Sequence, residues 1–505
     1  MRELKPMLLQ RRLRAALVLM LLLLPLPSGA LTILYFNDIH EIAPVDDGVR
    51  GGLARVAGLV TAERQAAQQV LVLIGGDLAG GTLFGLLRGE PMIKALNQIG
   101  IDAATFGQHE FDHGVEQARR LVELSEFPWL TANLTETDGT PFNELERYRI
   151  IEVNGFRLGV FGITTAMHTT RHENQVIEQD VITSARSAVA ALQASGADLI
   201  VALTQQTPAE DLDMVRAVPG IDLVLGEEVS ETRSRIDFEA GTYLARSAGN
   251  ISSIIRAEWL GPNRSDWRLS VIPVDANAPE DAEIAALSDH YMTRLTEQLA
   301  ASVREVEQPW RLPLERARSE ETVLGQLVAE AFRQAMDSDI GFASAGGLRA
   351  DLIAEPPALT LADVAAVLPF GNRLVQLQIS GAELRELMEL ALADHPTPRN
   401  RFPLISGITV RFDPEAPPGA RVSALEHNGK TLAPDQTLTL ATTLFLAEGG
   451  DGYALLRSLE QQAVGPLDRE ALAAWLANLE PWPPANSTMP ALRPVQVRGE
   501  PTAEF

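Results

Sequence analysis

The alternation of short apolar runs with helical stretches most limits how this chain can fold. From Leu31 to about Val274, stretches with helical periodicity, such as 53–69 and 182–195, separate runs rich in β-branched and other apolar residues. A regular alternation of strand and helix predicts βαβ units with a largely parallel sheet. We therefore expect an α/β unit over residues 31–275. Its apolar runs cover residues 31–36, 70–74, 158–163, 198–203 and 221–225.

The pattern changes near Pro279. A charged, Ala-rich stretch with apolar residues at helical spacing continues to Glu305, and we expect a linking helix within 276–311. A second globular unit is expected over 312–480, because a chain of 505 residues is too long for one core. The Pro-rich tail, 481–505, has too little apolar surface to fold alone.

The first thirty residues have the composition of a secretory signal peptide. Basic residues precede the apolar run Ala15–Leu24, and Ser28-Gly29-Ala30 offers small residues at the cleavage position. The apolar run is shorter than the roughly 18 residues of a membrane span. We expect residues 1–30 to be removed, leaving a periplasmic or secreted protein with no stable membrane span. Since the chain has no cysteine, its core must hold it without disulfides.

The charge of the chain excludes one class of partner. With 67 acidic and 42 basic residues the net charge is -25, which repels nucleic-acid polymers. A small anionic substrate would need a local positive site, supplied by a metal ion or by clustered arginines. The sequence gives no indication of the oligomeric state.

Acidic and histidine side chains follow the apolar runs. Asp38 and His40 come directly after the first run, Asp77 follows the second, and residues 107–114 read Gly-Gln-His-Glu-Phe-Asp-His-Gly. The carboxyl ends of parallel strands converge on one crevice, so these side chains can meet around a cation. A lone Asp-x-His is usually a loop turn, but an ordered series of such clusters favours a metal site beside a phosphate.

Together with 203–205 and 226–230, these motifs resemble the 5'-nucleotidase family of two-metal phosphoesterases, which includes UDP-sugar hydrolases. The resemblance implies an α/β fold (α+β overall): an N-terminal calcineurin-like metallophosphoesterase β-sandwich flanked by helices, a linking helix and a C-terminal 5'-nucleotidase-type α/β domain. It implies catalytic roles for His109 and Asp112. It implies that the metal ligands are Asp38, His40, Asp77, Gln108, Gln205, Glu228 and Ser230.

The chain departs from the family pattern at the metal ligands. Gln108 stands where the family has Asn, and Gln205, Glu228 and Ser230 stand where it has His. Amide and carboxylate oxygens suit Mn, Mg or Ca, whereas imidazoles suit Zn. We expect one or two divalent ions of these kinds per chain. Three hypotheses stay open: a working phosphoesterase, a nucleotide-binding relative with little turnover, and a thiosulfate-releasing hydrolase.

Three segments of the C-terminal unit, 342–349, 368–372 and 445–453, resemble further family motifs. The resemblance implies a nucleotide or related phosphate ester as substrate. An isolated Phe usually packs in a core, but within these motifs two aromatic rings can clamp a base. An Arg can bind phosphate and an Asp can accept bonds from ribose. The implied substrate-binding residues are Arg349, Phe370, Asn372, Phe445, Gly450 and Asp451.

Overall fold

The computed structural model describes residues 31–481, except 68, 154, 171–174 and 262, together with 496–497. The predicted signal peptide and most of the Pro-rich tail lie outside the described residues. Among the helices that are described, none combines the length and the apolar character needed to cross a bilayer.

Two six-stranded sheets form the N-terminal unit, in the orders β14-β13-β1-β2-β3-β4 and β11-β12-β10-β9-β7-β6. Strands β1 to β4 are parallel, and so are β7, β9, β10 and β12. The first sheet consists of β1 (Leu31–Phe36), β2 (Val70–Ile74), β3 (Ala103–Thr105), β4 (Trp129–Leu130), β13 (Ser253–Trp259) and β14 (Trp267–Pro273). The second consists of β6 (Tyr148–Val153), β7 (Phe156–Thr164), β9 (Leu199–Gln205), β10 (Leu223–Gly226), β11 (Arg235–Glu239) and β12 (Thr242–Arg246).

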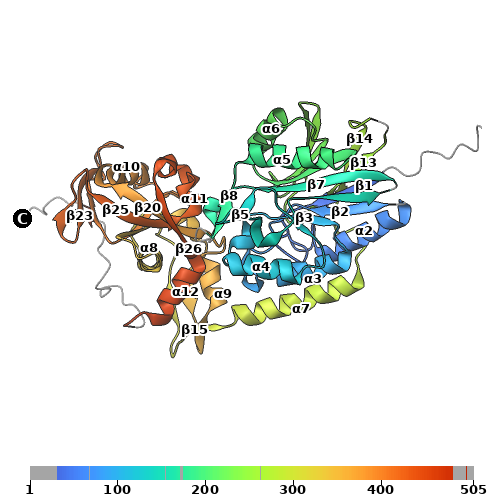
Figure 1. The fold of residues 1–505 in the computed structure, drawn as a ribbon. Coiled ribbons are helices and arrows are strands. Elements are labelled where there is room, and N and C mark those ends of the chain that lie inside the picture. The colour runs from blue at the N-terminus through green and yellow to red at the C-terminus, as the bar shows by residue number, and fades with distance from the viewer. Residues whose placement is uncertain are drawn as a thin grey trace, which may run out of the picture.

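The sheets pack face to face between two layers of helices (Figure 1). Helices α2 (Leu53–Ala66), α3 (Glu90–Ile99), α4 (Val115–Leu124) and α7 (Ala282–Leu299) cover the first sheet, and α5 (Val181–Ala194) and α6 (Pro208–Ala217) cover the second. Side chains alternate along a strand, so Ile33 and Tyr35 enter the core between the sheets, while Leu34 and Phe36 enter the core under the helices. The predicted β-sandwich flanked by helices is confirmed.

The C-terminal unit has a single core between its helices and two sheets of its own, β21-β17-β25-β20-β26 and β24-β23-β22-β27. Its helices are α8 (Val323–Ala335), α9 (Leu361–Val367), α10 (Gly381–Ala391), α11 (Leu444–Ala447) and α12 (Asp468–Asn478). The five-stranded sheet consists of β17 (Ile340–Ser344), β20 (Arg373–Ser380), β21 (Pro403–Ser406), β25 (Thr437–Thr443) and β26 (Gln461–Leu467). The other consists of β22 (Thr409–Phe412), β23 (Val422–His427), β24 (Lys430–Thr431) and β27 (Gln496–Val497).

Helix α7 runs along α2 and α3, as Figure 1 shows, and therefore packs with the N-terminal unit. The chain then enters β15 (Ser302–Glu305), which pairs with β19 (Ala358–Thr360) of the C-terminal unit. Two further two-stranded ribbons pair β16 (Trp310–Leu312) with β18 (Leu352–Ala354), and β5 (Leu134–Glu136) with β8 (Val176–Glu178). The domain boundaries at 275 and 311 stay a prediction.

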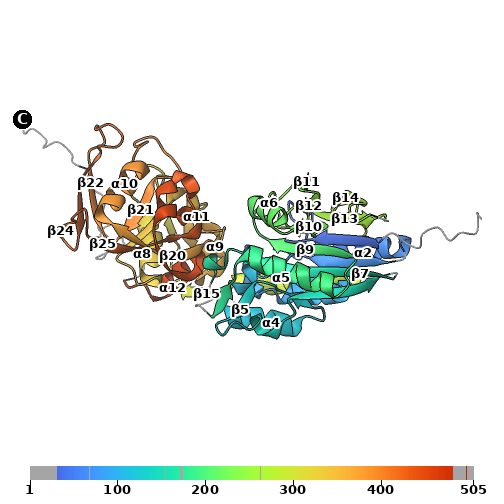
Figure 2. The same cartoon turned by 45° about the horizontal axis from the view of Figure 1, so that its top comes forward.

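The two units lie side by side in both views, and hydrogen bonds join them (Figures 1 and 2). The Arg469 guanidinium donates to the Thr82 carbonyl at 2.8 Å, and the Gln461 amide donates to the His168 carbonyl at 2.7 Å. These contacts bring the C-terminal unit against the loops that follow β2 and β7.

The carboxyl ends of the parallel strands from both sheets meet at one edge of the N-terminal unit. In the first sheet Phe36 pairs with Ile74, and in the second Gly226 pairs with Thr204. The Tyr35 hydroxyl crosses between the sheets and donates to the Gly226 carbonyl at 3.0 Å. The loops that leave these strands therefore converge.

Candidate active site

Three carboxylates gather at this edge. Oxygens of Asp38, Asp77 and Glu227 all lie within 4.8 Å of one another, and we call these residues the carboxylate cluster. Asp38 and Asp77 follow their strands with φ of 53° and 56°, a left-handed conformation that is costly for non-glycine residues and concentrates at functional sites. Their side chains are 3% and 2% exposed. Backbone geometry thus holds two acids where water does not solvate them.

Without a cation, the three carboxylates of the cluster repel one another. Burial, then the neighbouring acids Asp77 and Glu227, raise the pKa of Asp38 well above its usual range. Burial, then Asp77 and Glu228, raise the pKa of Glu227 to about 8. A divalent cation would remove this repulsion, and a set of carboxylate oxygens suits Mg, Mn or Ca.

Gln205 also lies at this edge, and its side chain can offer a ligand atom to such an ion. It is buried, and its Nε2 has no hydrogen-bond partner among the described residues. Gln205 is the last residue of β9, one position beyond the pair formed by Thr204 and Gly226. Since the oxygen and nitrogen of an amide are interchangeable by a flip, Gln205 can offer its oxygen to a cation.

His40 is prepared to bind as a neutral ligand. Its Nδ1 lies 3.1 Å from the Gly80 carbonyl, so this nitrogen donates and the lone pair remains on Nε2. Burial, followed by the nearby His109, lowers the pKa of His40 to about 4. The two imidazoles meet edge to face, with ring centroids 5.3 Å apart.

His109 and Asp112 form a hydrogen-bonded dyad beside the cluster. His109 Nδ1 lies 2.9 Å from Asp112 Oδ2, and the His109 backbone N–H donates to Asp77 Oδ1 at 2.9 Å. Burial lowers the pKa of His109, but Asp112 and then Asp77 outweigh it and raise this pKa to about 10. Burial opposes ionisation of Asp112, yet His109 and then Arg373 hold the pKa of Asp112 well below its usual range. In the absence of a bound cation, these pKa shifts favour an imidazolium–carboxylate pair.

Glu110 fastens the two loops that carry these residues, a role that the sequence analysis missed. Its fully buried carboxylate accepts hydrogen bonds from the backbone N–H groups of Asp77 (3.1 Å), Leu78 (2.7 Å) and Gly107 (2.6 Å). The only available signal was its position inside the octapeptide. Buried N–H groups need such partners, so Glu110 fixes the loop after β2 to the loop after β3.

Two glycines allow the acids to approach the backbone. A Cβ atom at Gly107 would lie 1.9 Å from Asp77 Oδ1, and one at Gly80 would lie 1.9 Å from Asp112 Oδ2. Any side chain at either position would displace a carboxylate, so only glycine fits.

The remaining predicted ligands lie around this centre. Gln108 Oε1 accepts a hydrogen bond from the Thr169 hydroxyl at 3.2 Å, and the Glu228 backbone N–H donates to Asp38 Oδ2 at 3.4 Å. Ser230 Oγ accepts from the Thr232 N–H at 3.3 Å. Glu227, which the sequence analysis did not select, joins the carboxylate cluster instead of its neighbour Glu228. The ligand roles of all the predicted residues stay predictions: Asp38, His40, Asp77, Gln108, Gln205, Glu228 and Ser230.

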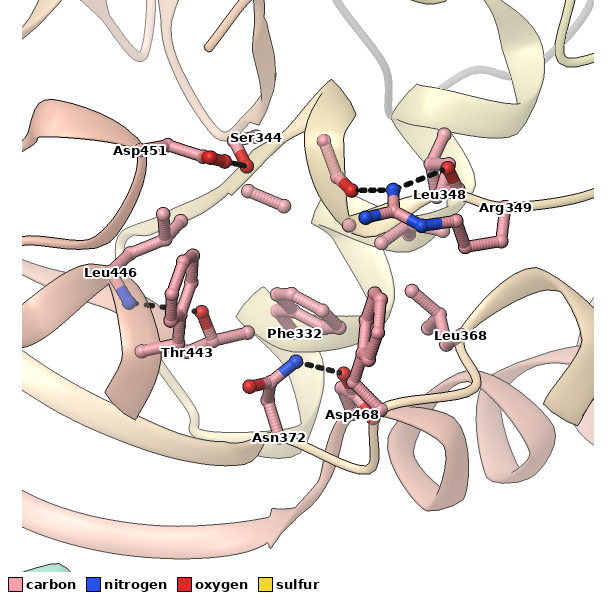
Figure 3. A pocket seen from close by; sticks show the side chains of 16 residues that line it. Phe332, Ser344, Leu348, Arg349, Leu368, Asn372, Thr443, Leu446, Asp451 and Asp468 are labelled. Atoms are coloured by element: carbon pink, nitrogen blue, oxygen red, sulfur yellow. Dashed lines mark hydrogen bonds between the residues drawn. The ribbon is translucent and has the colours of Figure 1, made fainter. Parts of the chain in front are cut away.

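The predicted substrate-binding residues surround a cavity of about 230 Å³ in the C-terminal unit (Figure 3). Phe370 and Phe445 are half exposed, at 50% and 49%, which is unusual for rings of this size. Apolar side chains line much of the remaining wall. The members of this wall are Val328, Phe332, Leu348, Leu368 and Leu446.

We call this cavity the nucleoside pocket, after its predicted ligand. Polar groups lie on two of its sides. The Ser344 hydroxyl donates to Asp451 Oδ2 at 2.5 Å, and the Asn372 amide donates to Asp468 Oδ2 at 3.3 Å (Figure 3). The Arg349 guanidinium lies 4.7 Å from the centre of the Phe370 ring.

Gly450 has a different place from the other predicted substrate-binding residues. A Cβ atom there would lie 2.5 Å from the Phe445 ring, so Gly450 makes room for that side chain.

Comparisons with known proteins agree with this architecture. A family model described as the 5'-nucleotidase C-terminal domain matches residues 301–458. The protein UshA of Yersinia enterocolitica is 26% identical over 512 residues, which cover 89% of this chain and 91% of UshA. Across both units the chain is therefore similar to the 5'-nucleotidase family of two-domain metallophosphoesterases. The resemblance predicted from its motifs is therefore confirmed.

The relatives differ in length. The trifunctional nucleotide phosphoesterase YfkN of Bacillus subtilis is 26% identical over 505 residues, covering 89% of this chain. This chain spans only 34% of YfkN. The crystal structure of a 5'-nucleotidase precursor from Thermus thermophilus shares the fold, with a TM-score of 0.59 and 24% identity over 94% of this chain and 100% of that one.

Proposed function

We propose that this protein is an exported, metal-dependent phosphoesterase that hydrolyses nucleotides or related phosphate esters. The observation that carries the proposal is the hydrogen-bonded pair His109–Asp112 directly beside the carboxylate cluster. A protein that only bound nucleotides would have no use for a charged dyad at this place. The family membership and the names of its relatives support the same reaction class.

The metal-binding part of the site consists of the carboxylate cluster with His40 and Gln205. A divalent cation held there would polarise a phosphoryl oxygen and activate a water molecule for attack. Asp77 lies at the centre, because its Oδ1 also accepts the His109 N–H. The largely oxygen-based donor set favours Mn, Mg or Ca over Zn.

The dyad stabilises charge on the phosphoryl group. Asp112 holds His109 Nδ1, so the Nε2–H of the imidazolium is fixed in direction and can donate to a phosphoryl oxygen. Because Asp112 and Asp77 keep the pKa of His109 high against the effect of burial, His109 stays a cation while the oxygen gains negative charge.

The nucleoside pocket recognises the rest of the substrate. A base can stack between Phe370 and Phe445, ribose hydroxyls can donate to Asp451, and Arg349 can pair with phosphate. The signal-like composition of residues 1–30 supports export to the periplasm or to the outside of the cell.

Elemental analysis of purified protein, followed by a screen of phosphate esters with Mn, Mg, Ca and Zn, tests the proposal. We expect at least one bound ion per chain and phosphate release from a nucleotide. We expect His109→Asn to reduce kcat by about 10³-fold with bound metal unchanged. Bound nucleotide without phosphate release under any ion would instead identify a binding protein. Thiosulfate release without competition by adenosine would identify a sulfur-oxidation hydrolase.

A further inference from the structure

The carboxylate of Asp112 contacts side chains of both units of the chain. Its Oδ2 meets His109, and its Oδ1 lies 3.2 Å from Nη2 of Arg373, which belongs to the C-terminal unit. This contact is an ion pair without hydrogen-bond geometry. The side chains of Arg373 and Asp112 are only 5% and 9% exposed. Exposed ion pairs contribute little, but a desolvated pair depends strongly on its partner and its geometry.

Arg373 is fixed by its own unit. Its Nη1 donates to the Gly465 carbonyl at 2.9 Å, and its backbone opens β20 opposite Leu467. The residue before it, Asn372, lines the nucleoside pocket and donates to Asp468. Arg373, which contacts the dyad, is therefore adjacent in sequence to Asn372, which lines the pocket.

A second arginine repeats this arrangement. Asp468 lines the pocket, and the next residue, Arg469, donates to the Thr82 carbonyl at 2.8 Å. Thr82 in turn donates through its hydroxyl to the His40 carbonyl at 3.0 Å. Gly371 leaves room for this arginine, because a Cβ there would lie 2.6 Å from Arg469 Nη1. Both arginines therefore reach from the pocket wall to the loops that hold the metal and the dyad.

We propose that Arg373 is a positioning residue of the catalytic dyad, supplied by the C-terminal unit. By holding Oδ1 of Asp112, it turns the other carboxylate oxygen toward His109. The imidazole is then aimed correctly only while the C-terminal unit is docked as in this structure. The inference rests on the proposed phosphoesterase function and links occupancy of the pocket to the chemistry.

Kinetics of Arg373→Gln and Arg373→Lys test the inference, with the best ester from the screen as substrate. For Arg373→Gln we expect kcat to fall roughly 10- to 100-fold, while KM changes by less than about threefold. The reason is that the variant loses the orientation of the His109 imidazole and keeps the groups that bind substrate. Arg373→Lys should recover part of kcat. The matched control is Gln461→Ala, which removes a contact between the units away from the dyad and should keep kcat.

A double-mutant cycle with Asp112→Asn separates positioning from general support of the fold. If Arg373 acts through Asp112, then Arg373→Gln has little further effect on kcat in the Asp112→Asn background. Losses that multiply would overturn the inference, as would an unchanged kcat in Arg373→Gln alone. If Arg373→Gln does not fold, the same cycle uses Arg373→Lys. A wild-type enzyme that releases no phosphate with any ion overturns the proposed function as well.

Discussion

In the loop after β10, the position of a single residue decides which side chain joins the carboxylate cluster. Gly226 pairs with Thr204, and the next residue, Glu227, brings its carboxylate to Asp38 and Asp77. Glu228 contacts Asp38 through its backbone N–H. A carboxylate inside the cluster ligates a metal directly, whereas a neighbour outside it acts only through charge.

We therefore expect Glu227→Gln to weaken Mn binding by at least about tenfold, since a charged oxygen donor is lost. Glu228→Gln is the matched control and should change the affinity by much less. Isothermal titration calorimetry of the metal-free proteins with Mn measures both affinities without requiring turnover. Equal affinities for the two variants, or a larger loss in Glu228→Gln, would show that Glu228 is the ligand.

At the scale of elements, the strands place the site, and the buried carboxylate of Glu110 helps to join its loops. β2 and β3 are parallel neighbours, and the loops that leave them carry Asp77 and His109. Glu110 accepts three N–H groups from these two loops. Without its carboxylate, three donors would be buried unpaired.

Glu110→Ala should lower the free energy of unfolding by about 3 kcal/mol or more, because each buried unpaired donor costs about 1–3 kcal/mol. Glu116→Ala is the control, since the Glu116 side chain is 88% exposed, and it should stay within about 0.5 kcal/mol of wild type. Urea unfolding of the metal-free proteins measures both changes. Similar midpoints would mean that water or another group can replace Glu110.

The sequence was sufficient to predict these elements and the first acids of the site. Apolar runs are visible in sequence, so β1 and β2, and with them Asp38 and Asp77, were found where they were expected. Glu227 was missed because the turn after β10 decides whether Glu227 or Glu228 points to the cluster, and a turn leaves no periodic pattern in the sequence. Arg373 was missed because its partner, Asp112, lies in the other unit, and contacts between distant segments leave no local signal.

At the scale of the whole molecule, the proposed chemistry and the proposed recognition of substrate belong to different units. All residues that line the nucleoside pocket come from the C-terminal unit, whereas the carboxylate cluster belongs to the N-terminal unit. Among the described residues, polar contacts between the units include Arg469 with Thr82, Gln461 with His168 and the ion pair of Arg373 with Asp112. Polar interfaces of this kind favour relative motion of domains.

A cleavable crosslink between the units should therefore stop steady-state turnover, because substrate entry and product release require the units to separate. The chain has no cysteine, so Gln461→Cys with His168→Cys introduces a single reactive pair at an existing contact. We expect phosphate release to stop on reaction with a cleavable bis-maleimide and to return on cleavage. Gln461→Cys alone, treated in the same way, is the control. Full turnover in the crosslinked protein would show that the units work without separating.

The guanidinium of Arg349 above the Phe370 ring has a consequence for the order of events in turnover. A nucleoside must compete with this cation for one face of the ring. Under the proposed function, the phosphate of a nucleotide would draw the guanidinium aside and uncover the stacking surface. After hydrolysis and loss of phosphate, the arginine would return to the ring and displace the nucleoside.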